Sequence, residues 1–216
     1  PQGDPGPLMA AIRDKRGPGT KPIALVTGGY GFIGSHMVDV LLAAGYRVRV
    51  VDDLGGGHWD NLAHVADDPD VETTIADIME IEPESPVFDA VSLVFHFAGI
   101  GDIVPSINMP TRYMDVNVQG TVRVLEAARR AGVERFVYAA SSSCYGLATT
   151  PTGEDHPIDP RYPYALSKYQ GEQAVMHWGR LYGLPVNAVR IFNAYGPRVR
   201  TTGAYGAVFG VFLKQK

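Results

Sequence analysis

Short strand-like segments, of which 23–26 is a continuous apolar run and 91–97 is nearly all apolar, alternate along this chain with segments in which apolar residues recur every three or four positions. Runs of the first kind are typical of strands buried on both faces of a parallel sheet, and the second spacing is typical of helices. The predicted strands lie at 23–26, 47–51, 71–76, 91–97, 136–140 and 186–191. The predicted helices lie at 32–42, 108–131 and 164–182, with a weaker helical patch near 61–65. Because strand and helix alternate without an internal repeat, the pattern predicts an α/β fold with a doubly wound parallel sheet and a site at the carboxyl ends of the strands.

A glycine-rich turn joins the first predicted strand to the first predicted helix, with Gly28, Gly31 and Gly34 spaced three residues apart. Gly28 and Gly31 allow the backbone to turn tightly and to approach a pyrophosphate, and Gly34 allows the helix and the strand to pack closely. The helix N-terminus offers free N–H groups and a partial positive charge to the phosphates. Asp52 ends the second predicted strand, where a carboxylate accepts hydrogen bonds from an adenosine ribose. Together these features predict a Rossmann-type dinucleotide-binding domain.

The charge at Asp52 favours NAD over NADP, because a carboxylate there repels a 2′-phosphate. Arg47 and Arg49 precede Asp52 in the strand rather than following it. After the third predicted strand, Asp77 is placed to bind the amino group of an adenine and Ile78 to pack against its face, although a simple strand-end turn is the alternative interpretation.

The fourth predicted strand leads into His96, Phe97, Ala98 and Gly99, where small residues let the backbone lie close to a cofactor. We interpret His96 as a packed core histidine rather than an acid or base. Asn117, inside the helix predicted at 108–131, is expected to hydrogen-bond the backbone of an adjacent strand, which is a structural role.

Composition and charge narrow the class of protein. The net charge of -4 argues against nucleic acid or an anionic membrane surface as the main partner. No apolar run approaches the ~20 residues of a membrane span, and no export signal is visible at the N-terminus. The single cysteine, Cys144, rules out an internal disulfide framework and fits a reducing cytoplasm. The six histidines show no ligand spacing, so no metal site is expected.

Tyr164 and Lys168 lie four residues apart, and hence on one face of a predicted helix. A free phenol has a pKa of ~10, and a nearby ammonium together with a positive nicotinamide ring lowers that pKa. Tyr164 is then able to exchange a proton with a substrate hydroxyl, while Lys168 hydrogen-bonds the cofactor ribose. A surface pair is the alternative. We favour catalysis because this helix follows the fifth strand, which ends in the serine cluster Ser141, Ser142 and Ser143.

These motifs resemble those of the extended short-chain dehydrogenase/reductases, specifically the nucleotide-sugar epimerases and dehydratases. The matching segments are 27–34, Asp52, 77–78, 96–99, 141–143, Tyr164 with Lys168, and 190–193. The resemblance covers Pro22 to the end of the chain and implies tightly bound NAD. The implied cofactor-binding residues are Gly28, Gly31, Phe32, Ile33, Gly34, Asp52, Asp53, Asp77, Ile78, Phe97, Ala98, Gly99, Tyr164 and Lys168.

The resemblance also implies a catalytic serine, tyrosine and lysine. The catalytic hydroxyl of the family lies four residues before a Tyr-Gly pair, which selects Ser141, although a shift of one residue in the alignment passes the role to Ser142. Ser142, Ser143 and Asn193 are expected on the substrate side, with Asn193 near the substrate diphosphate.

Within the family, 4,6-dehydratases carry an Asp-Glu pair after the catalytic hydroxyl, but this chain has Ser142 and Ser143 there. The glutamate usual in the decarboxylases is absent too. The serine run and the segment 203–208 look most like UDP-hexose 4-epimerases, including those that accept N-acetylhexosamines. The implied reaction oxidises C4 of the sugar transiently by hydride transfer to NAD and returns the hydride to the opposite face. A dehydratase or a decarboxylase is the alternative.

Residues 1–22 are rich in Pro and Gly and are expected to form a flexible extension. The resemblance assigns 23–200 to the NAD-binding domain with the catalytic residues and 201–216 to the start of a substrate-binding region. Family members continue into a smaller C-terminal domain, so a non-catalytic NAD-binding module is another alternative. They are commonly homodimers through two helices, for which 108–131 and 164–182 are the candidates.

Overall fold

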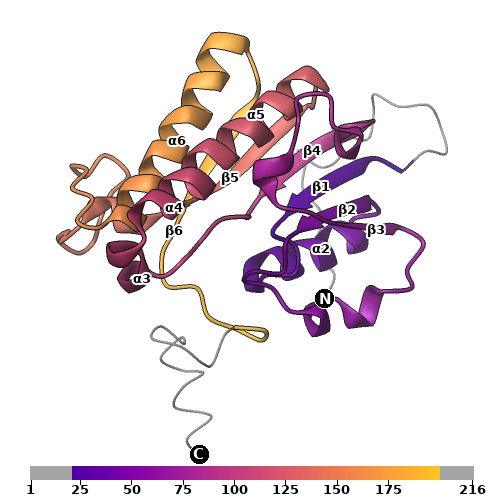
Figure 1. The fold of residues 1–216 in the computed structure, drawn as a ribbon, viewed down its shortest axis with the longest axis horizontal. Helices are drawn as coiled ribbons and strands as arrows, with labels where there is room; N and C mark the ends of the chain where they lie inside the picture. Colours follow the sequence, from indigo (N-terminus) through magenta and orange to yellow (C-terminus); the bar gives the residue numbers. More distant parts are fainter. Residues whose placement is uncertain (1–20, 200–216) are drawn as a thin grey trace, which may run out of the picture.

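A six-stranded parallel sheet forms the centre of the molecule, as the computed structural model shows for residues 21–199 (Figure 1). The strand order is β3-β2-β1-β4-β5-β6, and all five neighbouring pairs are parallel. The strands are β1 (Ile23–Thr27), β2 (Arg47–Asp52), β3 (Val71–Ile75), β4 (Val91–His96), β5 (Arg135–Ser141) and β6 (Val186–Ile191). The predicted α/β class and its doubly wound sheet are confirmed. The strand order reverses between β1 and β4, and a crevice for ligands opens beyond the strand ends at such a point.

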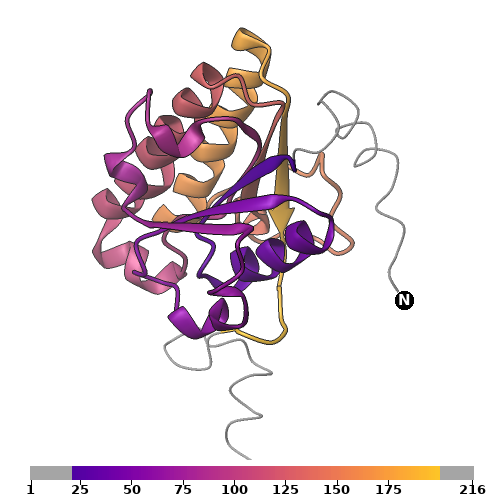
Figure 2. The ribbon, with the colours of Figure 1, turned by 90° about the vertical axis from the view of Figure 1, so that its right-hand side faces the viewer.

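Helices cover both faces of the sheet (Figure 2). They are α2 (Phe32–Ala43), α3 (Ile103–Asn108), α4 (Pro110–Met114), the π-helical η5 (Asp115–Gly120), α5 (Thr121–Arg130) and α6 (Pro163–Tyr182). One buried apolar cluster packs the sheet against α5 and α6, and a second packs it against α2. None of the helices that the structure describes is long and apolar enough to cross a membrane.

The helix predicted at 108–131 differs from the structure in two ways. Pro110 lacks an N–H and restricts the residue before it, so α3 ends at Asn108 and α4 begins at Pro110. A π-helical segment, Asp115–Gly120, then widens one turn before α5 continues.

The weaker patch predicted near 61–65 forms two 3₁₀ turns, η1 (Trp59–Asn61) and η2 (Ala63–Val65). Further 3₁₀ turns are η3 (Ile78–Glu80), η4 (Pro86–Phe88) and η6 (Ser142–Tyr145). The predicted extension at 1–22, apart from Lys21 and Pro22, and the region at 201–216 lie outside the described residues.

Candidate active site

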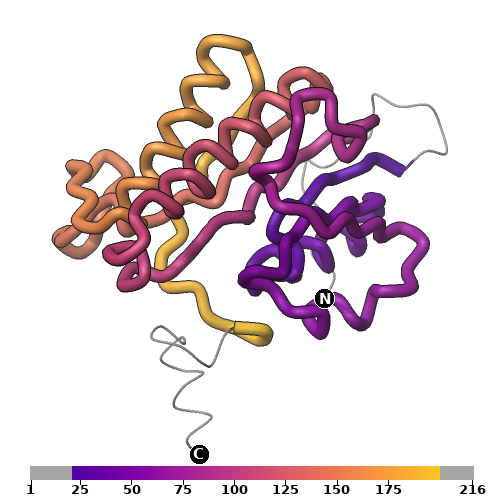
Figure 3. The backbone as a smooth tube through the Cα atoms, viewed as in Figure 1, coloured from indigo at the N-terminus to yellow at the C-terminus, as the bar shows by residue number. Residues whose placement is uncertain are grey.

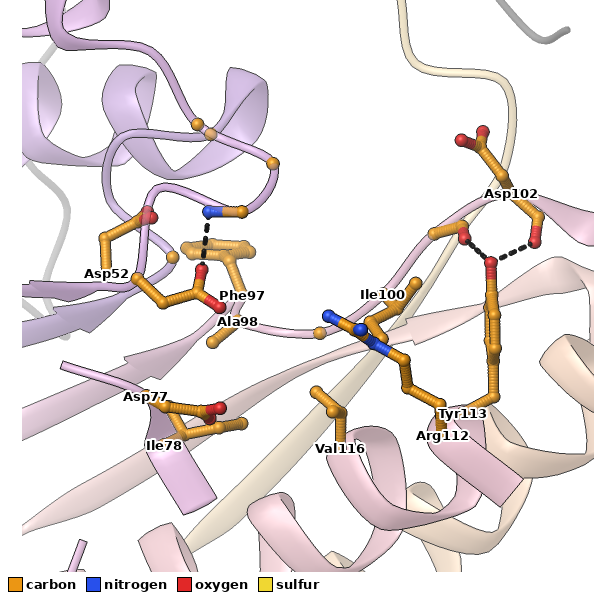
Figure 4. Close-up of a pocket in the computed structure, with 18 of the residues that line it drawn as sticks. Asp52, Asp77, Ile78, Phe97, Ala98, Ile100, Asp102, Arg112, Tyr113 and Val116 are labelled. Atoms are coloured by element: carbon orange, nitrogen blue, oxygen red, sulfur yellow. Dashed lines mark hydrogen bonds between the residues drawn. The ribbon is translucent and has the colours of Figure 1, made fainter. Parts of the chain in front are cut away.

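Two adjoining cavities open at the carboxyl ends of the strands, where the sequence predicts the site. The first has a volume of about 490 Å³ and is lined by the turn after β1 and by the ends of β2, β3 and β4 (Figure 4). The second has a volume of about 740 Å³ and is lined by the same turn and by the ends of β5 and β6. Both volumes fall in the range of small-molecule sites. Six residues line both cavities: Gly28, Gly31, Phe97, Gly99, Ile100 and Gly101.

The glycine-rich turn is built so that a side chain fits at neither Gly28 nor Gly34. Gly28 has a φ of +72°, and a Cβ there lies 2.6 Å from the backbone nitrogen of Ala98. A Cβ on Gly34 lies 2.1 Å from the carbonyl oxygen of Gly28, so the first turn of α2 packs directly on the turn that precedes it. Gly31 is the N-cap of α2 and provides no side-chain cap, which leaves N–H groups of the first turn available to an anion.

Four aspartates line the first cavity, and three of them, Asp52, Asp53 and Asp77, lie at or just after the ends of β2 and β3. Asp52 is buried, and its carboxylate accepts hydrogen bonds from the backbone nitrogens of Tyr30 at 2.9 Å and Leu54 at 2.7 Å. Burial raises the pKa of Asp52, and these two hydrogen bonds oppose that rise. Asp53 is exposed and accepts a hydrogen bond from the backbone nitrogen of Gly55.

Asp77 caps η3, because its Oδ1 accepts a hydrogen bond from the backbone nitrogen of Met79 at 2.9 Å, and Ile78 is buried. The strand-end turn considered from the sequence therefore forms. Both residues still line the first cavity, so their adenine contacts stay a prediction.

His96 is fully buried in a chain of hydrogen bonds that runs in one direction. The backbone N–H of Ala98 donates to Thr27 Oγ1 (3.3 Å), and the Thr27 hydroxyl donates to His96 Nδ1 (2.6 Å). His96 Nε2 then donates to Thr121 Oγ1 (3.0 Å), whose hydroxyl donates to the carbonyl oxygen of Asn117 (2.7 Å). Burial, with a smaller contribution from the charge of Lys168, lowers the pKa of His96 to about 3, so the ring stays neutral. The interpretation of His96 as a packed core histidine agrees with this geometry.

Asn117 holds a loop rather than a strand, which corrects the sequence-based expectation. Its amide accepts a hydrogen bond from the backbone N–H of Ile100 (2.8 Å), donates one to the carbonyl of Ile100 (3.0 Å), and donates another to Ser167 Oγ (3.0 Å). The loop after β4 is thereby tied to η5 and α6. Asn117 has a structural role, as expected, but its backbone partner is Ile100, which belongs to the wall common to both cavities.

The predicted catalytic residues meet in the second cavity. The hydroxyl of Tyr164, from the first turn of α6, donates to Ser141 Oγ at the end of β5 over 3.4 Å. Ser141 Oγ also contacts Ser143 Oγ at 2.8 Å and accepts from the backbone N–H of Ser143 at 3.2 Å. Lys168 follows one turn after Tyr164 on α6, and its ammonium lies 4.3 Å above the ring centre of Tyr138. Ser142 and Asn193 line the same cavity.

The pKa shifts of Tyr164 and Lys168 differ from the expectation drawn from the sequence. Burial raises the pKa of Tyr164, and the hydrogen bond to Ser141 only opposes that rise. Burial also lowers the pKa of Lys168 to about 7, which weakens the ammonium charge that was expected to stabilise a phenolate. The polypeptide by itself therefore does not lower the pKa of Tyr164, because desolvation outweighs the one hydrogen bond.

Three residues of the first cavity went unnoticed in the sequence. The Tyr113 hydroxyl donates to the carbonyl oxygens of Gly101 (2.6 Å) and Asp102 (2.9 Å), and its ring packs edge-to-face on Tyr164 with 6.3 Å between centroids. Asp102 has a φ of +69°, a conformation that is rare for a residue other than glycine. Arg112 is the one lysine or arginine among the described residues that line this cavity, and its side chain points into it (Figure 4). Only the Gly-Asp pair at 101–102, a turn signal, marked this region.

Among residues 21–199, no group of three or more His, Cys, Asp or Glu side chains is arranged to hold a metal ion.

Comparison with protein families identifies the chain. The NAD dependent epimerase/dehydratase family matches residues 24–215. The chain belongs to this family. The UDP-glucose 4-epimerase of Mycolicibacterium smegmatis is 39% identical over 187 residues, which are 85% of this chain and 60% of that protein. UDP-glucuronic acid decarboxylase 1 of Arabidopsis thaliana is 35% identical over 181 residues, which are 81% of this chain and 40% of that protein.

Solved structures of the family superimpose closely. The UDP-glucose 4-epimerase of Thermotoga maritima, solved with UDP-glucose, has a TM-score of 0.82 at 33% identity. The superposed region covers 89% of this chain and 62% of the epimerase chain. The dTDP-glucose 4,6-dehydratase of Streptomyces venezuelae, solved with NAD and TYD, has a TM-score of 0.82 at 34% identity with the same coverage. The chain thus spans about 60% of the length of the epimerases that it matches.

Proposed function

We propose that the protein is an NAD-dependent 4-epimerase that acts on a UDP-hexose. One arrangement supports this reaction above all: the Tyr164 hydroxyl lies 3.4 Å from Ser141 Oγ, beside Lys168, in a cavity that adjoins the one behind the glycine-rich turn. A proton-transfer group and a hydroxyl donor are thus aimed at the same point.

The residues of the first cavity and of the common wall fit NAD. Gly28 and Gly31 line the cavity at the start of α2, where the free N–H groups of the first helical turn fit a pyrophosphate, and Asp52 lies where a ribose hydroxyl binds. Arg49 is occupied by Glu72 at 2.9 Å and by the carbonyl of Val87 at 2.6 Å, so it is not placed to bind a 2′-phosphate. When bound, NAD supplies a hydride acceptor at the C4 carbon of the sugar and afterwards the hydride donor.

The side chains of the second cavity divide the proton chemistry. In its ionised form Tyr164 accepts the proton of the C4 hydroxyl as C4 is oxidised and returns it at the end. Because burial raises the pKa of the phenol, the positive nicotinamide ring of bound NAD would supply the charge that favours the ionised form. Ser141 hydrogen-bonds the C4 oxygen throughout, because its hydroxyl shares the position that the phenol faces. The ammonium group of Lys168 has no hydrogen-bond or ion-pair partner within the described part of the chain, which leaves its N–H groups free for a ribose hydroxyl.

The lining of the second cavity favours epimerisation over dehydration. None of the described residues that line it is an aspartate, a glutamate or a histidine, and its titratable side chains are Tyr145, Tyr164 and Lys168. Loss of water across C5–C6 needs an additional acid and base, for which Ser142 and Ser143 are unsuited. A decarboxylase or dehydratase is the second candidate because both classes occur among the relatives. We also propose a cytoplasmic homodimer, with the two helical regions named above as the interface.

Proton NMR of anomeric signals tests the proposal directly. The purified chain is incubated with UDP-hexoses, UDP-N-acetylhexosamines and UDP-uronates, and interconversion of a C4 epimer pair is the expected result. A product lighter by water or carbon dioxide, detected by mass, indicates the second candidate. NAD in the denatured supernatant without any turnover indicates a binding module.

The Tyr164→Phe variant tests the role of the phenol. We expect turnover to fall by about 10²–10⁴-fold, the range of general acid–base contributions, while NAD stays bound. Tyr162→Phe is the matched control, because this exposed tyrosine lies outside both cavities. Full activity in Tyr164→Phe contradicts the mechanism.

A further inference from the structure

The segment 193–199, which follows β6, crosses from the edge of the sheet to α2. Figure 3 shows this yellow segment running beneath the strand ends toward the indigo part of the chain. Among the described strands, β6 pairs only with β5, at the opposite side of the sheet from β2 and β3, whereas α2 follows β1. The edge position of β6 does not by itself direct the following segment across the sheet to α2. We therefore attribute the course of segment 193–199 to its contacts with other elements.

The contacts are polar and come from two separate elements. His36 Nε2, on α2, donates to the carbonyl oxygen of Pro197 at 3.0 Å. Arg198 Nη1 forms an ion pair with Asp39 Oδ2 of α2 at 2.8 Å. His64, from η2, donates through Nε2 to Asp39 Oδ1 at 2.7 Å. One aspartate therefore joins three segments that are distant in sequence.

His64 Nε2 has two polar neighbours, and the position of its proton decides which of them it hydrogen-bonds. Its Nε2 also lies 3.4 Å from Arg198 Nη2, but a nitrogen that donates a proton to Asp39 is unable to accept one from a guanidinium. Within residues 21–199, the guanidinium of Arg198 is therefore held by its ion pair with Asp39. Arg198 has a φ of +67°, a strained backbone conformation for a residue other than glycine that persists only where surrounding contacts impose it.

The same segment completes the second cavity. Asn193 and Ala194 line it opposite Phe32 and Ile33, which belong to the first turn of α2. Gly196 lies against the Phe32 ring, since a Cβ there lies 3.6 Å from a ring carbon. None of the residues 193–199 lines the first cavity.

We infer that Asp39, His64 and Arg198 form a latch that holds segment 193–199 on α2 and so positions the wall of the second cavity around the nicotinamide half of the cofactor. The three act as positioning residues, because none of them lines either cavity. The inference rests on the proposed cofactor site. It predicts that the latch affects ligands that extend into the second cavity and spares ligands confined to the first.

Calorimetric titration with NAD and with ADP tests this prediction. ADP carries only the adenosine and pyrophosphate groups, so it serves as a probe of the first cavity. In Arg198→Gln and Asp39→Asn we expect NAD to bind about fivefold more weakly, as expected from the loss of a partly screened ion pair, with ADP binding unchanged. Arg198→Lys keeps the charge and is expected to restore most of the NAD affinity. Arg130→Gln is the matched control, because it removes an ion pair with Glu126 away from both cavities.

Hydrogen exchange of peptides that cover 193–199 provides a readout without any ligand. We expect Asp39→Asn to accelerate exchange there and Arg130→Gln to leave it unchanged. Equal NAD affinity in Arg198→Gln and wild type, an equal loss of NAD and ADP affinity, or unchanged exchange in Asp39→Asn each overturns the latch. A wild-type chain that binds neither NAD nor ADP overturns the proposed function instead, and the exchange experiment then still decides on the latch.

Discussion

Replacing Gly34 by alanine adds one methyl group at the tightest backbone contact of the nucleotide-binding turn. The added carbon lies 2.1 Å from the carbonyl oxygen of Gly28 and 2.9 Å from Gly29 Cα. An ordinary carbon–oxygen contact is about 3.3 Å, so α2 and the turn must separate by roughly 1.2 Å. Gly28 cannot move away easily, because the side of its Cα that would carry a Cβ already lies against the backbone of Ala98.

The expected effect follows from two opposing contributions. Overpacking of this kind destabilises by about 1–3 kcal/mol, while alanine gains at most about 1 kcal/mol of helix propensity. The free energy of unfolding should therefore fall by up to about 2 kcal/mol, which corresponds to a melting temperature lower by up to about 8 °C for a domain of this size. NAD affinity should fall more than tenfold, because the first turn of α2 moves by a distance that breaks hydrogen bonds.

Urea unfolding and NAD titration measure the two effects. Gly31→Ala and Gly101→Ala are the comparisons. Gly31 has a φ of -73° and a Cβ there stays 3.1 Å from Gly28 O, whereas a Cβ on Gly101 meets nothing within 4 Å. We expect destabilisation in the order Gly34, Gly31, Gly101. A Gly34→Ala variant as stable as Gly101→Ala, with wild-type NAD affinity, refutes the packing account.

Two further predictions concern pH. Because the pKa of Lys168 is lowered to about 7, the cofactor-free fold gains stability as pH rises from 7 toward 10.5, where the folded chain has lost a proton that the unfolded chain keeps. Lys168→Met should flatten this rise and be the more stable protein at pH 6, and urea unfolding across pH 6–10 without NAD checks it; a parallel pH dependence in both proteins rejects the assignment. Because the pKa of His96 is lowered to about 3, wild type should lose stability steadily as pH falls from 6.5 toward 3. His96→Gln should reduce that slope in acid unfolding followed by circular dichroism, and an unchanged slope means that another group is responsible.

The strands and the glycine turn were predictable because each depends on local sequence. Buried parallel strands favour continuous apolar runs such as 23–26, and the spacing of Gly28, Gly31 and Gly34 between a strand and a helix is typical of a dinucleotide-binding turn. The π-helical turn at Asn117 was not predictable, because it depends on contacts with Ile100 and Ser167.

The charges and long-range contacts of the site depend on the fold as well. The sequence places Lys168 beside Tyr164, but the pKa values follow from burial, which spacing on a helix does not reveal. Asp39 and Arg198 are far apart in the chain and meet only because the segment after β6 returns across the sheet. Asp102 and Tyr113 likewise meet through a loop whose path no periodicity predicts.

The wall common to the two cavities bears on how such enzymes diverge. Four of its six residues are glycines, so most of that surface is main chain, which substitution hardly changes. Few side chains are therefore available in the common wall for substitution to alter. A side chain added at Gly28 collides with the backbone of Ala98, so we expect it to lower the stability of the fold. Substitutions at Asp102, Arg112 and Ser142, which line one cavity each, are expected to change the lining of that cavity without disturbing the common wall. Under the proposed function, a change of sugar specificity is therefore expected to come from such positions, while the common wall stays the same.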